Sequence, residues 1–153
     1  MNPRSESIGY WLSAIHRHTM IYLDRETVPL NIGSGQAMFL AHLYHRDGVS
    51  QEELSRELKF DKATTARAIS KLEKEGLVRR NRDPGDRRAY RVSLTGRGRD
   101  AGDELRVILR GWTETLARGL TARERRLLVD MLQRVFVNAT DATCGGAGGE
   151  RKP

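Results

Sequence analysis

Short and cationic side chains alternate with apolar ones between Lys62 and Lys74. Thr65, Ala68, Ile69 and Leu72 recur at helical spacing and would face a protein core. The opposite face carries Lys62, Ala63, Thr64, Arg67, Ser70, Lys71 and Lys74. A helix divided in this way fits the B-DNA major groove, which is about 12 Å wide and admits one helix. Arg67 is the candidate bidentate reader of guanine, whereas the lysines are better placed for phosphates.

A second basic group follows the turn-forming sequence DPGD at residues 83–86. Arg87 or Arg88 at the tip of such a hairpin could enter a minor groove, where narrow A·T tracts attract arginine. Asp86 is placed to direct that guanidinium through an ion pair. The flanking arginines are expected to line the adjoining DNA backbone; they are Arg79, Arg80, Arg82 and Arg91.

Several helices and one hairpin are predicted to position these groups. Capping residues, helical periodicity and a switch to period-two alternation define the elements. They are helices over 7–28, 34–46 and 50–58, a helix from Asp61 to Gly76, strands over 77–82 and 89–94, a helix after Thr95, and a last helix opened by Thr121. The second helix is expected to bury Met38, Leu40 or Ala41, and Leu43.

This order predicts a mainly α-helical fold with a small β-hairpin wing. Residues 34–95 would form a winged helix-turn-helix domain. Residues 7–33 and 96–138 would form a helical dimerisation lobe built from the N- and C-terminal helices. Residues 139–153, rich in glycine and small polar side chains, are expected to be a disordered tail.

The charge is concentrated in the segment that carries the candidate DNA contacts. The chain has 153 residues, a net charge of +7 and a pI near 10.1. Residues 61–99 hold 12 Lys/Arg and 5 Asp/Glu, while the rest of the chain holds 15 of each. A localised basic stripe is what binding to a phosphate backbone requires.

Other classes of protein find little support in the sequence. No apolar run approaches the roughly 20 residues of a membrane span, and the N-terminus lacks the layout of a signal peptide. The single cysteine, Cys144, excludes an internal disulfide framework, so a reducing cytoplasm is the expected location. No catalytic motif is present, and we expect neither an enzyme nor a cofactor.

The stretch from Asp61 to Gly98 resembles the recognition helix and wing of the MarR family of bacterial and archaeal regulators. The family wing pattern Asp-x-Arg, five residues, Leu-Thr falls on Asp86, Arg88, Leu94 and Thr95. The resemblance extends over roughly residues 7–138. It implies that Arg88 enters the minor groove with Asp86 orienting it, and that bases are read by Lys62, Thr64, Thr65 and Arg67, although the helical period turns Thr65 inward.

The terminal helices carry more apolar surface than the winged domain can cover. These residues are Ile8, Trp11, Leu12, Ile15, Trp112, Leu116, Leu120, Leu128, Met131, Leu132 and Val135. Some of them must pack on one another within one chain. A single winged domain offers too few base contacts for specificity, and the resemblance implies paired terminal helices. We therefore expect a homodimeric repressor on a pseudo-palindromic duplex operator.

The resemblance also implies a small aromatic or phenolic effector bound between the lobes. The candidate wall consists of Tyr10, Trp11, His16, Arg17, His18, Met20, Met38, His42 and His45. Aromatic and methionine residues at helical spacing are more often plain core. We expect no metal site on the histidines, because no Cys, Asp or Glu completes the set of ligands. The alternative to an operator-binding regulator is a winged-helix module that binds RNA or a protein partner.

Overall fold

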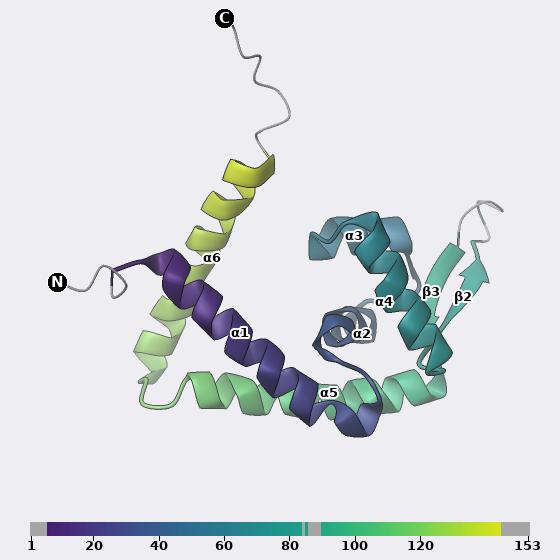
Figure 1. Ribbon diagram of the computed structural model, residues 1–153, viewed down its shortest axis with the longest axis horizontal. Coiled ribbons are helices and arrows are strands. Elements are labelled where there is room, and N and C mark those ends of the chain that lie inside the picture. The colour runs from purple at the N-terminus through teal and green to yellow at the C-terminus, as the bar shows by residue number, and fades with distance from the viewer. Residues whose placement is uncertain (1–5, 84, 86–89, 145–153) are drawn as a thin grey trace, which may run out of the picture. The chain divides into compact units, whose positions relative to one another are not determined.

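The structure, a computed structural model, describes residues 6–83, 85 and 90–144 (Figure 1). The chain divides into two compact units, residues 1–112 and 113–153. The first contains α1 (Ile8–Glu26), η1 (Val28–Leu30), α2 (Ser34–His45), β1 (Val49–Ser50), α3 (Gln51–Leu58), α4 (Lys62–Lys74), β2 (Val78–Arg82), β3 (Tyr90–Leu94) and most of α5 (Gly96–Leu116). The second contains the end of α5 and α6 (Ala122–Cys144). The predicted fold class, mainly helical with a small β wing, is confirmed.

Short polar side chains start the helices where the sequence predicts. The backbone amide of Glu53 donates to Ser50 Oγ at 3.1 Å, and the Ser50 amide donates to Glu53 Oε2 at 2.8 Å. Asp61 and Thr95 accept from the amides three residues on, at 2.7 and 3.0 Å. At the start of α6 the Glu124 amide donates to Thr121 Oγ1 at 3.3 Å, and the Thr121 amide donates to Glu124 Oε2 at 2.7 Å. Each cap satisfies an amide that has no partner inside its helix, which fixes the first turn.

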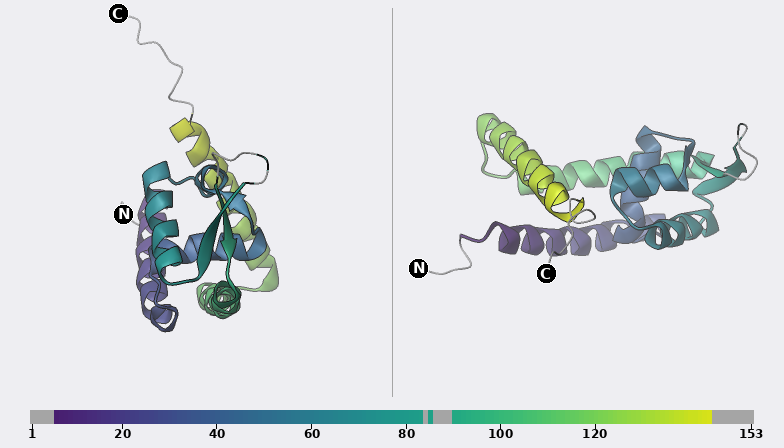
Figure 2. Two further views of the ribbon diagram at one scale, coloured as in Figure 1. Left: turned by 90° about the vertical axis from the view of Figure 1, so that its right-hand side faces the viewer. Right: turned by 90° about the horizontal axis from the view of Figure 1, so that it is seen from above.

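A three-stranded antiparallel sheet in the order β1–β3–β2 stands beside α4 (Figures 1 and 2). Val49 pairs with Val92, and Val78 pairs with Leu94. All four side chains are buried, so one face of the sheet closes the core. The sequence did not predict β1, because a two-residue strand is too short to show alternation.

Helix α2 supplies the centre of the core. Phe39, Leu40 and Leu43 are fully buried, as are Leu54 of α3 and Leu105 of α5. The prediction that Met38 is buried is wrong: its side chain is 43% exposed and the neighbouring Phe39 turns inward instead. A one-residue shift rotates a helical side chain by about 100°, so Phe39 takes the core position and excludes Met38 from it.

Helices α1 and α5 pack on the winged-helix elements within the first unit. Leu23 of α1 joins the same core as Leu105. Tyr22 stacks on Trp112 with ring centroids 4.6 Å apart, and the Trp112 indole N–H donates to Thr19 Oγ1 at 3.1 Å. The N-terminal part of the predicted lobe therefore shares a core with residues 34–95, and its pairing with a second copy stays a prediction.

The last helix is longer than the sequence analysis predicts. Helix α6 continues to Cys144, so the expectation of a disordered tail from residue 139 is wrong for residues 139–144. Alanines favour the helix there, and the Thr140 and Thr143 hydroxyls donate to the carbonyls of Val137 and Ala139. Residues 145–153 lie outside the described part of the chain. Among the described residues no helix has the length and hydropathy to cross a bilayer.

Candidate nucleic-acid interface

Helix α4 has one buried and one exposed face, as its sequence predicts. Ala68, Ile69 and Leu72 are buried against the core. The exposed side chains are those of Lys62, Ala63, Arg67, Ser70, Lys71 and Lys74, with Thr64 half-buried. Thr65 does not belong to this face, which corrects its proposed role in base reading. Its side chain is fully buried and its hydroxyl donates to the Asp61 carbonyl at 3.0 Å, because its helical position faces inward.

The first turn of α4 holds a chain of three polar side chains. Asp61 Oδ1 accepts from the Thr64 amide and Oδ2 accepts from the Thr64 hydroxyl, both at 2.7 Å. The Thr64 hydroxyl in turn accepts from Arg67 Nη2 at 2.9 Å. The Thr64 side-chain hydrogen bond, followed by its amide, lowers the pKa of Asp61 below its ordinary value, so this carboxyl is ionised at neutral pH.

Lys62, at the start of α4, contacts α3. Its Nζ lies 3.1 Å from Glu52 Oε1, and both side chains are more than 70% exposed. An ion pair this exposed contributes little to stability and is easily exchanged for a phosphate. Lys71 and Lys74 are exposed on the same helix. Three lysines are thus available to a DNA backbone along the length of α4.

Arg80 of β2 is committed to the protein rather than to DNA. Its guanidinium donates to Glu73 Oε2, to Ser70 Oγ at 3.0 Å and to Gln51 Oε1 at 2.9 Å. The expectation that it lines the DNA backbone is therefore wrong. The three partners lie on α3 and α4, so Arg80 ties the wing to both helices of the helix-turn-helix. Ser70 is correspondingly occupied, although its side chain is exposed.

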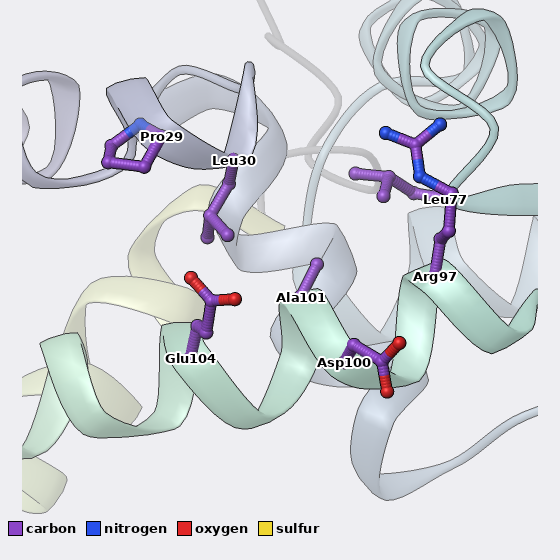
Figure 3. A pocket seen from close by; sticks show the side chains of 7 residues that line it. All are labelled: Pro29, Leu30, Leu77, Arg97, Asp100, Ala101 and Glu104. Carbon is purple, nitrogen blue, oxygen red and sulfur yellow. The ribbon is translucent and has the colours of Figure 1, made fainter.

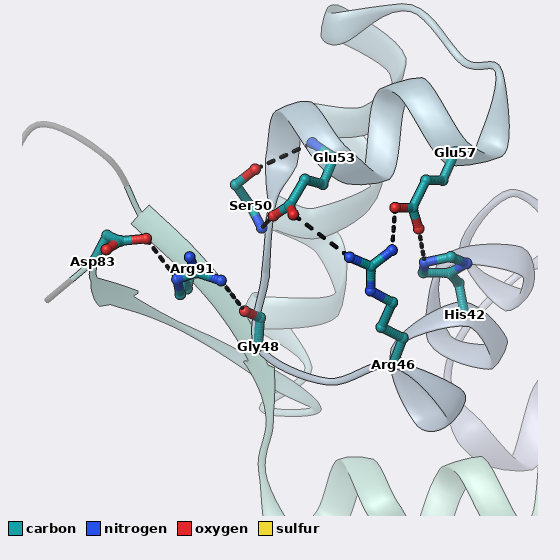
Figure 4. Close-up of polar contacts among 8 residues, drawn as sticks. All are labelled: His42, Arg46, Gly48, Ser50, Glu53, Glu57, Asp83 and Arg91. Carbon is teal, nitrogen blue, oxygen red and sulfur yellow. Dashed lines mark hydrogen bonds and ion pairs between the residues drawn. The ribbon is translucent and has the colours of Figure 1, made fainter. Parts of the chain in front are cut away.

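Arg91 of β3 is held in a similar way (Figure 4). Its Nε lies 2.5 Å from Asp83 Oδ2, and its Nη1 donates to the Gly48 carbonyl at 2.9 Å. These contacts join β3 to the residue that follows β2 and to the turn before β1. The Arg91 side chain is also 44% exposed, and its contact with a phosphate stays a prediction. Arg79 and Arg82 remain exposed on β2. The wing-tip residues Asp86, Arg87 and Arg88 lie outside the described residues, and their DNA contacts stay predictions.

A polar network joins α2 to α3 behind the interface (Figure 4). Glu57 makes an ion pair with Arg46, and its Oε2 lies 2.9 Å from His42 Nε2. Arg46 also lies 3.6 Å from Glu53. Hydrogen bonds from the Ser50 amide and side chain lower the pKa of Glu53, so it stays charged beside Arg46. The network fixes α3, and hence α4, on α2.

The residues predicted to line an effector site do not gather around one described cavity. Tyr10 and Trp11 are exposed on α1 and pack edge to face, 5.2 Å apart. Met20 packs against the core, and His42 faces Glu57. The remaining members of the wall, His16, Arg17, His18, Met38 and His45, are exposed. The effector site stays a prediction.

A pocket of about 200 Å³ lies elsewhere, between η1 and the first turns of α5 (Figure 3). Its walls are formed by Pro29, Leu30, Leu77, Arg97, Asp100, Ala101 and Glu104. None of these residues was predicted to form a site. Six elements lie between η1 and α5 in the sequence, so only the fold brings these residues together.

Comparisons with known proteins identify the family. Residues 30–89 match the MarR family. The HTH-type transcriptional regulator YdgJ of Bacillus subtilis is 34% identical over 70% of this chain and 65% of its own length. The HTH-type transcriptional repressor NicR of Pseudomonas putida is 31% identical over 86% of this chain and 84% of its own length.

Solved structures agree over nearly the whole chain. A MarR transcriptional regulator from Methanosarcina mazei is 44% identical, covers 88% of this chain and 97% of its own, and superposes with a TM-score of 0.83. The structure of a putative MarR family transcriptional regulator from Listeria monocytogenes complexed with a 26mer DNA is 26% identical. It covers 97% of this chain and 99% of its own, and its TM-score is 0.86. The chain studied here belongs to the MarR family of transcriptional regulators.

Proposed function

We propose that the protein is a homodimeric repressor that binds a pseudo-palindromic duplex operator in a sequence-specific way. The observation that carries this proposal is the division of α4, whose buried face is held by the core while Ala63, Arg67 and three lysines face solvent. Small side chains permit close approach to base edges, arginine can read guanine, and lysines neutralise phosphates. The relative bound to a 26mer DNA supports a duplex as the target.

A duplex suits this surface better than single-stranded RNA. Recognition of single-stranded RNA depends on aromatic or planar side chains on which unpaired bases stack. The exposed face of α4 carries no aromatic side chain. A convex helix with short side chains at its N-terminal end fits a groove instead.

Apolar faces on the terminal helices support pairing of two copies. On α1, Trp11, Leu12 and Ile15 are each at least 38% exposed. On α6, the exposed apolar side chains include Leu127, Leu128, Met131, Leu132 and Phe136. Contiguous apolar surface of this kind marks an interface in a water-soluble protein. A two-fold pair would place two α4 helices on half-sites about one helical turn, or roughly 10 base pairs, apart.

Repression follows from occupancy of an operator, and the relative named as a repressor supports it. Release by a small aromatic acid belongs to the same proposal. Tyr10 and Trp11 offer stacking surface on α1, and Arg17 offers a partner for a carboxylate. A thermal-shift series with aromatic acids tests this part by itself: no stabilisation at millimolar concentration contradicts it and leaves DNA binding untouched.

Selection of bound fragments from a random duplex library tests the main proposal. We expect an enriched sequence with two-fold symmetry, bound far more tightly than a scrambled duplex or a single-stranded RNA of equal length. Binding should weaken steeply with salt, and Lys74→Ala should reduce the slope of log K against log salt by about 1 while lowering affinity for all duplexes alike. Equal binding to duplex, scrambled duplex and RNA would contradict the proposal.

A further inference from the structure

We propose that Thr64 is a positioning residue, which sets the direction of the Arg67 guanidinium for base reading and donates no hydrogen bond to a base. This inference rests on the proposed operator binding. By sequence alone, both Thr64 and Arg67 are candidates for base reading, because both lie on the exposed side of the first turns of α4. Their hydrogen bonds in the folded chain separate the two roles.

The single hydroxyl proton of Thr64 already has an acceptor. Asp61 Oδ2, 2.7 Å away, belongs to a carboxylate and can only accept, so the Thr64 hydroxyl donates to it. Arg67 Nη2 lies 2.9 Å from Thr64 Oγ1. Because this nitrogen can only donate, the Thr64 hydroxyl oxygen accepts from it. One donor and one acceptor function are thus used, and no proton is left for a base.

The Asp61 carboxylate, which accepts the Thr64 hydroxyl proton, is itself held in place. Its other oxygen, Oδ1, accepts from the Thr64 backbone amide at 2.7 Å as the helix cap. Asp61 therefore holds Thr64 at two atoms, and Thr64 holds one end of Arg67. The lowered pKa of Asp61, to which the charge of Arg67 also contributes, keeps the acceptor ionised at neutral pH.

Restraint of a long exposed side chain before binding has a direct consequence for affinity. Arginine loses rotamer freedom when it is ordered at an interface, and restraint in advance reduces that loss. The Nη2 hydrogen bond to Thr64 uses one of the five N–H protons of the Arg67 guanidinium, so four remain, and these include the second Nη2 proton that a bidentate contact with guanine needs. The arrangement thus favours the correct base pair without a further contact to DNA.

A double-mutant cycle on the selected duplex tests this coupling. The first step identifies the operator position at which Arg67→Ala relaxes base-pair preference. At each position, the affinities of wild type and Arg67→Ala are compared for four duplexes that carry the four possible base pairs there. Thr64→Val, which keeps the side-chain shape and removes the hydroxyl, should reduce preference at that same base pair by about two- to tenfold. In the Arg67→Ala background, Thr64→Val should produce no further change.

Two controls separate positioning from folding. Thr64→Ser keeps the hydroxyl and should retain the wild-type preference. The urea midpoint and the affinity for scrambled duplex should be nearly the same for wild type, Thr64→Val and Thr64→Ser, because Asp61 still caps the backbone amide of residue 64 in each. A simple structural defect would instead lower the midpoint and weaken binding to all duplexes.

The contrary outcomes are distinct. An undiminished preference in Thr64→Val, an effect at a different base pair, or an equal effect in the Arg67→Ala background overturns the inference while the operator-binding function stands. A wild-type protein that prefers no duplex sequence overturns the proposed function, and this inference fails with it.

Discussion

At the scale of single residues, the hydrogen-bond partners of each arginine divide the basic stripe into two sets. Arg80 and Arg91 have partners on several elements of the protein, whereas Arg79 and Arg82 are exposed on the same hairpin. By sequence, all four arginines are expected to line the DNA backbone, because residue type alone does not show which hydrogen-bond acceptors lie near each of them. The surface available to DNA is consequently narrower than the sequence suggests.

Adjacent arginines on β2 provide a direct test of this division. Arg80→Ala should lower the free energy of unfolding by about 1–3 kcal/mol, because Glu73 loses its cation and Ser70 and Gln51 lose a donor. Arg79→Ala should change it by less than about 0.5 kcal/mol, since its side chain is exposed. Urea denaturation measures both. Equal losses in the two variants would contradict the structural role of Arg80.

Gly98 of α5 packs against the backbone of Leu77, the residue before β2, and this close contact gives a second prediction at the residue scale. A Cβ at Gly98 would lie 1.9 Å from the Leu77 carbonyl oxygen, a backbone atom that cannot move aside. Gly98→Ala should therefore destabilise the protein by about 1–3 kcal/mol or more. Gly96→Ala, on the same helix with no atom within 4 Å of its Cβ, should leave the melting temperature nearly unchanged. A stable Gly98→Ala variant would show that the two elements can separate.

At the scale of elements, α4 is positioned by neighbours that are themselves fixed by caps and ion pairs. The Ser50–Glu53 capping box starts α3, and Glu53 and Glu57 tie that helix to Arg46 at the end of α2. Arg80 then joins α3 and α4 to the wing. These contacts hold α4 and strand β2 of the wing together, and the proposed function requires both to face one duplex.

The capping box makes a pH-dependent contribution to stability. Because its hydrogen bonds lower the pKa of Glu53 below the ordinary value of 4.5, its contribution is present above that pH and is lost as the pH falls through the folded-state pKa. Wild type should exceed Glu53→Gln in stability at pH 7, and the difference should shrink below about pH 4.5. Urea midpoints across pH 3–7 measure it.

Glu52→Gln serves as the neighbour control for this measurement. Its ion pair with Lys62 is highly exposed, so its removal should leave the pH profile close to that of wild type. A difference between wild type and Glu53→Gln that stays constant from pH 7 to pH 3 would contradict the role of the charged cap.

At the scale of the whole molecule, the proposed operator specificity requires two copies to pair, and we propose that they pair through apolar surfaces that one chain leaves exposed. Leu132 and Gln133 are consecutive on α6 and both exposed; they point about 100° apart around the helix, and Leu132 is apolar whereas Gln133 is already polar. Leu132→Glu should shift the protein from dimer to monomer in sedimentation and abolish tight operator binding. Gln133→Glu introduces the same side chain and should do neither. If Leu132→Glu also sediments as a dimer, α6 is not the interface.

The sequence by itself determined the helix starts, the wing and the two-sided character of α4, because those depend on local rules: caps satisfy the nearest amides, and a helix buries every third or fourth residue. It also sufficed for the family, since the wing pattern is contiguous. The inward turn of Thr65 was already visible in the helical period, and burial confirmed that interpretation over the role implied by family resemblance.

The tertiary structure alone decided what depends on residues distant in the chain. Arg80 meets Gln51 across 29 positions, and Arg91 meets the Gly48 carbonyl across 43, contacts that no local pattern encodes. The same holds for β1, for the exchange of Met38 with Phe39, and for the pocket at Arg97. Packing fixes these features because a buried position admits one side chain and excludes its neighbour, and because a guanidinium pairs with whichever acceptors the fold brings within reach.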